Sequence, residues 1–132
     1  LAIGRGIVTD RLLTTSAARA HAVGDCAEVC GLNLPYVMPI MQQARALAAT
    51  LSGTPTPVVY PAMPVTVKTP ACPTVVCPPP VDAIGAWDVQ ATDDACVARF
   101  VGADERLLGF ALMGGAVSQK QVLGALVPGL LV

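Results

Sequence analysis

The residues best suited to bind a ligand lie in one stretch, residues 14–28, which reads TTSAARAHAVGDCAE. Hydroxyl side chains lead into a run of small residues, 19–23, which we expect to form a short strand buried on both faces. The run stops at Gly24 and Asp25. Because glycine has no Cβ, the backbone at Gly24 can approach a ligand closely. Asp25 adds a carboxylate that only accepts hydrogen bonds, which suits the hydroxyl groups of a sugar alcohol.

A helix is expected shortly after this pair. Pro39 fits the first helical turn, where its missing N–H is harmless, and residues 41–51 are strong helix formers that Gly53 stops. The amino terminus of this helix, at Val37 and Met38, would present unpaired N–H groups and about half a positive charge. Such a terminus favours an anion, and the same helix would also serve for packing.

A Gly-Asp pair alone favours an ordinary turn, so the flanking sequence decides its meaning. The stretch resembles the second FAD-binding motif of the pyridine-nucleotide disulfide oxidoreductase superfamily, T-x-x-x-x-hydrophobic-hydrophobic-A-x-G-D. The matching residues are Thr15, Ala20, His21, Ala22, Val23, Gly24 and Asp25. With the segments 5–13, 33–39 and 65–73, nearly the whole chain resembles the rubredoxin-NAD(+) reductase family.

The resemblance implies a role for several of these residues. Gly24 and Asp25 would meet the ribityl chain of FAD, and the helix start at Val37 and Met38 would face the pyrimidine edge of the flavin. Lys68, in VTVKTPACP, would lie near the flavin and favour its reduced anionic form. A lone lysine in a strand is more often simply solvated. No residue of the chain is assigned a catalytic role.

The resemblance also implies the function. NADH would pass a hydride to FAD, and the reduced flavin would pass single electrons to rubredoxin. One alternative is a related flavoprotein reductase with another acceptor, such as ferredoxin or a nitrite reductase. A second alternative is a protein-interaction module without redox chemistry, built on the Pro-rich centre and the apolar surface. A G-x-G-x-x-G loop in the sequence upstream of the chain would favour the enzyme over the interaction module.

The chain lacks parts that such an enzyme needs. The family binds each dinucleotide on a Gly-rich G-x-G-x-x-G loop, and none is present in these 132 residues, which begin with Leu. We therefore expect the chain to be the carboxy-terminal part of a longer reductase, inactive by itself. Its partner in that enzyme would be the missing amino-terminal part, which binds FAD and NADH.

Charge and apolar content narrow the function classes further. The formal net charge is −1, and the Lys and Arg residues are scattered, so no basic patch for nucleic acid or a membrane surface is present. No apolar run approaches the roughly 18 to 20 residues of a membrane span. We expect a cytoplasmic protein. The hydrophobic fraction of 54% is expected to reflect a core plus an interface with the missing domains.

Five cysteines raise the question of a metal or redox site. Three residues separate Cys26 from Cys30, and four separate Cys72 from Cys77. Zinc half-sites and redox pairs usually have two residues between the cysteines, and one His adds little ligation. We therefore expect ordinary reduced thiols and no metal site.

The predicted fold class is α+β. Residues 1–53 would end an FAD-binding α/β domain with strands and one long helix, 54–64 would form a Pro-rich linker, and 65–132 would form a small antiparallel sheet with a carboxy-terminal helix. Residues 26–36 are expected to be a loop, and His21 and Trp87 to be buried. The final helix, at about 117–126, is expected to pack through Val117, Val122 and Leu126. Strands are expected at 65–69, 72–77, 86–89, 95–101 and 106–113.

Overall fold

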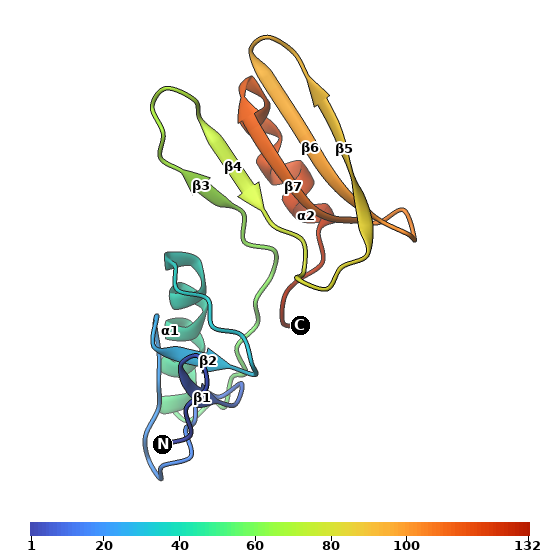
Figure 1. Ribbon diagram of the computed structural model, residues 1–132. Helices are drawn as coiled ribbons and strands as arrows, with labels where there is room; N and C mark the ends of the chain where they lie inside the picture. The colour runs from blue at the N-terminus through green and yellow to red at the C-terminus, as the bar shows by residue number, and fades with distance from the viewer. The chain divides into compact units, whose positions relative to one another are not determined.

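A computed structural model describes all residues of the chain, 1–132, and the chain forms two compact units (Figure 1). The first unit comprises Leu1–Tyr60 with Leu131–Val132, and the second comprises Pro61–Leu130. Short strands and one long helix make up the first unit, and a five-stranded antiparallel sheet with a terminal helix makes up the second. The predicted α+β class is thus confirmed. Neither α-helix combines the length and hydropathy that crossing a membrane requires.

In the first unit, two three-residue strands accompany one helix. Strand β1 (Ile7–Thr9) pairs in parallel with β2 (Ala27–Val29), and the helix α1 spans Val37–Leu51. The helix confirms the sequence-based prediction, including its stop. Gly53 has φ +94°, a conformation that glycine adopts without strain, and its N–H donates to the Thr50 carbonyl oxygen.

Two expectations for this unit are wrong. Residues 19–23 form no strand, and only an isolated bridge joins Thr14 to His21. The Thr15 N–H and hydroxyl both donate to the Ala20 carbonyl oxygen, at 3.0 and 2.9 Å, and Arg19 has φ +60°. The local side-chain bond closes a turn where a sheet would need an extended backbone. Strand β2, in contrast, lies inside the segment 26–36 that was expected to be a loop.

The second unit is built on one antiparallel sheet in the order β3-β4-β7-β6-β5. All five predicted strands are present. Their bounds are β3 (Val65–Val67), β4 (Thr74–Cys77), β5 (Gly85–Ala91), β6 (Ala95–Gly102) and β7 (Leu107–Gly114). The short 3-10 helix η1 (Gly115–Gln119) then leads into α2 (Lys120–Leu126).

The core of this unit lies on the face of the sheet that α2 covers, behind the strands in Figure 1. Leu123 of α2 is buried there, whereas Val122 and Leu126 are 67% and 62% exposed, so the prediction that these two residues pack inward is wrong. The buried cluster comprises Val75, Cys77, Val97, Phe110, Leu112, Ala116 and Leu123.

The opposite face of the sheet is also apolar, and no element of the unit covers it. Residues that pair in register share a face, so Val76, Ala111, Ala98 and Val89 form one row across four strands. The next row is Thr74, Met113, Cys96 and Ala91. We call these two rows the outer face. It carries no charged side chain, which fits the expected surplus of apolar surface.

Two residues expected in the interior lie at the surface. His21 is exposed. Trp87 of β5 is 48% exposed and contacts Phe100 edge to face, with ring centroids 5.3 Å apart. Strand β5 is an edge strand with every residue exposed, so its aromatic side chain has a neighbour on one side only.

Candidate functional site

The Gly24–Asp25 turn of the first unit has the properties of a ligand contact. Gly24 has φ +88°, and a Cβ placed on it would meet nothing within 4 Å, so open space lies beside this backbone. Asp25 is exposed, and its carboxylate makes no hydrogen bond within the chain. Both carboxylate oxygens are thus available to accept hydrogen bonds from a ligand.

Hydrogen bonds to main-chain carbonyl oxygens hold the turn from its carboxy-terminal side. The Asn33 side-chain amide donates to the carbonyl oxygens of Asp25 and Ala27, at 3.0 Å each. The Ala27 N–H donates back to the Gly24 carbonyl oxygen at 3.0 Å, and the Ile7 N–H donates to the Cys26 carbonyl oxygen at 2.7 Å. The short β1–β2 pair thus serves as an anchor for the turn.

A buried glutamine holds the turn from its other side. Gln43 of α1 is 2% exposed, and its Oε1 accepts a hydrogen bond from the Gly24 N–H at 2.6 Å. Its Nε2 donates to the Tyr60 hydroxyl oxygen at 2.7 Å. Sequence reasoning missed both Gln43 and Tyr60. The only signal was a polar residue on the apolar face of the helix, and the adjacent Gln42 made the choice ambiguous.

The amino terminus of α1 is the second candidate contact. No side chain caps the helix, and its first turn holds no acidic residue. Val37 and Met38 are 70% and 45% exposed, and the N–H groups of a first helical turn have no partner within the helix, which favours an anion nearby. Gln43 lies six residues beyond Val37, about 9 Å of helical rise, which ties this terminus to the Gly24–Asp25 turn through one rigid helix.

Lys68 belongs to the second unit. It follows β3 directly, in the connection to β4, where it is exposed and makes no hydrogen bond or ion pair. The other lysine of the chain, Lys120, donates from Nζ to the Thr66 hydroxyl at 3.0 Å. Of the five predicted site residues, four therefore lie on the turn and the helix start of the first unit, and Lys68 lies apart in sequence and in unit.

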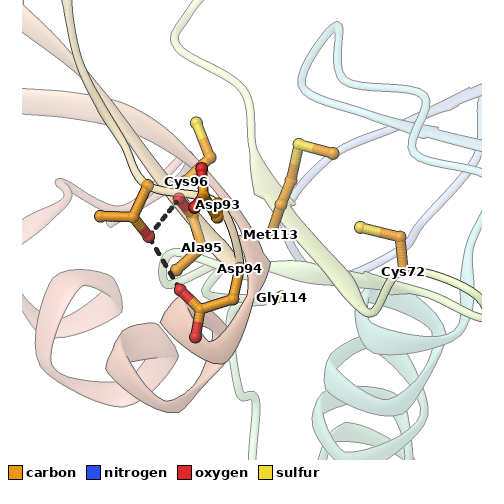
Figure 2. Close-up of a pocket in the computed structure, with 8 residues that line it drawn as sticks. Cys72, Asp93, Asp94, Ala95, Cys96, Met113 and Gly114 are labelled. Carbon is orange, nitrogen blue, oxygen red and sulfur yellow. Dashed lines mark hydrogen bonds between the residues drawn. The ribbon is translucent and has the colours of Figure 1, made fainter.

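A small pocket lies at one end of the second unit's sheet (Figure 2). Its volume of about 180 Å³ is below the roughly 300 Å³ at which sites for cofactor-sized ligands begin. The Thr92 hydroxyl donates to the Asp94 carboxylate at 2.9 Å, so part of the polar lining is already paired. The lining residues are Cys72, Thr92, Asp93, Asp94, Ala95, Cys96, Met113 and Gly114.

All five cysteines are free thiols, and no group of three or more potential ligands from His, Cys, Asp and Glu is arranged for a metal ion. Cys26 and Cys30 are exposed, whereas Cys77 is buried in the core of the second unit. Burial raises the pKa of the Cys77 thiol, because the thiolate would lose its hydration.

Comparison with known families identifies the second unit. The model of the "Rubredoxin binding C-terminal domain" matches residues 57–126, more than half of the chain. The chain belongs to the rubredoxin-binding C-terminal domain family. The match spans all five strands of the sheet and ends with α2. The resemblance recognised in the sequence is thereby confirmed.

Relatives with assigned names extend the likeness to the first unit. The chain is 53% identical over 127 residues to the rubredoxin-NAD(+) reductase of Alcanivorax borkumensis and 53% identical over 128 residues to that of Acinetobacter baylyi. It is 42% identical over 118 residues to the nitric oxide reductase FlRd-NAD(+) reductase of Aeromonas salmonicida. The first two alignments cover 96% of this chain, and the chain spans about a third of the length of these relatives.

Solved structures agree on the fold. The chain superposes on NADH:rubredoxin oxidoreductase from Clostridium acetobutylicum with a TM-score of 0.74 at 19% identity, covering 96% of this chain and 33% of that one. The covalent putidaredoxin reductase-putidaredoxin complex gives a TM-score of 0.76 at 20% identity, with 96% and 32% coverage. These proteins thus share the fold of both units with the present chain.

Thiol reactivity tests the placement of the cysteines. With a maleimide at pH 8, we expect Cys26 and Cys30 to be modified at least about tenfold faster than Cys77, because Cys77 is buried and its raised pKa leaves less thiolate at that pH. Peptide mass spectrometry after timed quenching measures each site. In urea all five thiols should react at similar rates, and equal rates without urea would contradict the described core.

Proposed function

We propose that the chain works as the carboxy-terminal part of an FAD-dependent NADH oxidoreductase that passes electrons to rubredoxin. The observation that carries this proposal is the 53% identity, over 96% of the chain, to two rubredoxin-NAD(+) reductases. The second unit would contribute to binding the acceptor, as its family description indicates. The uncovered apolar outer face of its sheet is typical of a unit that works within a larger protein.

The residues of the first unit fit one end of FAD. The open space at Gly24 admits close approach, the unpaired Asp25 carboxylate suits the ribityl hydroxyls, and the α1 terminus at Val37 and Met38 suits the electron-rich pyrimidine edge. Bound FAD supplies the step between the two-electron donor NADH and a one-electron iron acceptor. The pyrophosphate cradle of FAD would come from the amino-terminal part of the enzyme.

Charges and dipoles at this site would shift the reduction potential of the proposed flavin by a small amount. A helix terminus contributes about 1 kcal/mol to a nearby anion, which corresponds to about 20 mV for a two-electron couple. Lys68 would add a cation of the same order from the second unit. These residues would orient and bias the flavin, and none is a nucleophile or a proton carrier in the proposal.

One observation favours a second candidate for the electron acceptor. The 42% identity to a nitric oxide reductase FlRd-NAD(+) reductase favours FlRd, the acceptor in that name, as a second candidate. Ferredoxin and a nitrite reductase are further candidate acceptors, and a protein-interaction module without redox chemistry is the competing class of function. Comparing turnover with rubredoxin, ferredoxin and an inert dye acceptor separates these cases. We place the enzyme in the cytoplasm, where NADH is available and where five free thiols stay reduced.

Replacing Asp25 tests the flavin contact. In the full-length reductase, Asp25→Ala removes a charge-assisted hydrogen bond of about 1.5 to 3 kcal/mol, so FAD affinity should fall roughly 10- to 150-fold. Recovery of flavin fluorescence on dilution measures the affinity. Asp82→Ala is the matched control, because Asp82 is also exposed and its side chain makes no hydrogen bond. Equal affinity of the Asp25 variant and the control would remove Asp25 from the site.

Replacing Lys68 tests the electrostatic role. Lys68→Met keeps most of the side-chain length and deletes the charge, so the flavin midpoint potential of the full-length enzyme should fall by about 30 mV if about 1.4 kcal/mol is lost. Spectroelectrochemical titration measures the midpoint. Lys120→Met removes the other lysine of the same unit and should leave the midpoint unchanged. No change in either variant would leave Lys68 a solvated surface residue.

The 132-residue chain by itself tests whether FAD binding and NADH oxidation need the amino-terminal part of the enzyme. One charge-assisted hydrogen bond and one helix terminus supply about 2.5 to 4 kcal/mol, which corresponds to millimolar binding at best. The purified chain should therefore be colourless and should not oxidise NADH in the presence of rubredoxin. Absorbance at the flavin band and the rate of NADH loss measure both properties. A yellow and active preparation would show that the chain carries a complete site.

A further inference from the structure

One buried side chain, that of Gln43, connects the proposed flavin contact at Gly24 to Tyr60, the last residue before the chain enters the second unit. We propose that Gln43 is a positioning residue, whose side-chain amide fixes the Gly24–Asp25 turn against α1 and is held at its other end by the Tyr60 hydroxyl. This inference rests on the proposed function, because it gives Gln43 a part in the same site. Gln43 does not face the ligand, and it acts through Gly24.

The chemistry of the three groups fixes the orientation of the amide. The Gly24 N–H can only donate, so it requires the Oε1 atom of Gln43, which lies 2.6 Å from the Gly24 nitrogen. This leaves Nε2 to donate to the Tyr60 hydroxyl oxygen, 2.7 Å away. An amide turned by 180° would set two donors against each other at Gly24. The Gly24 N–H therefore selects the orientation, and the Tyr60 hydroxyl accepts the bond that satisfies the other end of the buried amide.

Tyr60 is held firmly enough to do this. Its side chain is fully buried, and its main chain pairs with Leu131 in both directions, with N to O distances of 2.7 and 3.2 Å. Burial raises the pKa of the Tyr60 hydroxyl, the nearby Cys30 thiol raises it further, and the bond from Gln43 lowers it. The net increase keeps the hydroxyl neutral under ordinary conditions, so no charge is trapped beside Gln43.

The turn depends on this bond because its other side is open. Nothing lies within 4 Å of the position a Cβ would take at Gly24, and the exposed Asp25 side chain makes no hydrogen bond. The remaining anchors, the Asn33 amide and the Ala27 N–H, bind only carbonyl oxygens of the turn. Gln43 alone holds a main-chain N–H of this pair, so its loss would free the backbone that carries the Asp25 carboxylate.

The first measurement is hydrogen exchange of the Gly24 amide in the 132-residue chain, followed by NMR. Gln43→Met keeps the side-chain length and removes both hydrogen bonds, so Gly24 should exchange at least about tenfold faster. Gln42→Met is the matched control, since the Gln42 side chain makes no hydrogen bond, and it should leave Gly24 unchanged. The Val58 amide, which donates to the Arg11 carbonyl oxygen at 2.7 Å, is the internal reference and should not change.

The second measurement is FAD release from the full-length reductase. Gln43→Met should weaken FAD binding about tenfold, and Gln43→Glu should restore most of it, because a carboxylate can accept from both the Gly24 N–H and the Tyr60 O–H. A residue needed only for packing would not be rescued by a buried carboxylate. Tyr60→Phe should give an intermediate loss, since it removes the hydrogen bond at the far end of the amide and keeps the Gly24 contact.

Each outcome decides the proposal. Unchanged Gly24 exchange in Gln43→Met overturns it, and so does faster Gly24 exchange with unchanged FAD affinity. If Gln43→Met also accelerates hydrogen exchange of the Val58 amide, the same measurement on Tyr60→Phe decides. Equal acceleration of the Gly24 and Val58 amides in Tyr60→Phe overturns the proposal. A wild-type reductase that binds no FAD would instead refute the proposed function, while the exchange data would still report whether Gln43 holds the turn.

Discussion

A buried amide needs a partner at each of its two ends, and this requirement shapes the first unit more than any other interaction. Leaving one end of Gln43 unpaired would cost about 1 to 3 kcal/mol, a large fraction of the stability of a small unit. Gly24 supplies a donor to one end and Tyr60 supplies an acceptor to the other. Two segments far apart in the sequence, at Gly24 and at Tyr60, are thereby fixed to one helix.

The second unit is shaped by a different constraint, the apolar character of both faces of its sheet. A sheet of this kind is typical of proteins that cover both faces, whereas a sheet with one wet face alternates apolar and polar residues. Helix α2 has seven residues and covers one face. The outer face keeps Val89 and Met113 at 58% and 42% exposure. The unit therefore has more apolar surface than its own elements can bury.

The sequence predicted the regular elements well where side-chain period and helix propensity decide the local structure. Five strands, the long helix and the terminal helix lie where alternation, Ala-rich composition and stop residues indicated. The segment 19–23 failed because Thr15 makes a local bond to Ala20 that closes a turn, and propensity does not register such a bond. Strand β2 was missed because three residues between a cysteine loop and a proline carry too short a pattern.

The candidate site was predictable only in part. The Gly24–Asp25 pair and the helix start at Val37 and Met38 are each formed by neighbouring residues within matched segments of the sequence. The resemblance could therefore assign roles to them. Gln43 and Tyr60 act through contacts 19 and 17 residues apart along the chain, and a buried glutamine has no local signature that distinguishes it from its half-buried neighbour Gln42. Lys68 was found by its motif, and the Pro-rich stretch 54–64 already led to the prediction that it lies in a different domain from Gly24 and Asp25.

The two-residue pairing of Tyr60 with Leu131 has a consequence for how this architecture can vary. The first unit is discontinuous in sequence, and residues 61–130 form an insertion whose two ends are clasped together by this pairing. Insertions whose two ends are adjacent are readily tolerated, because the surrounding fold needs no adjustment beyond the residues that pair at the two ends. A first unit of this kind can receive a different inserted unit while the segments that surround Gly24 keep their geometry.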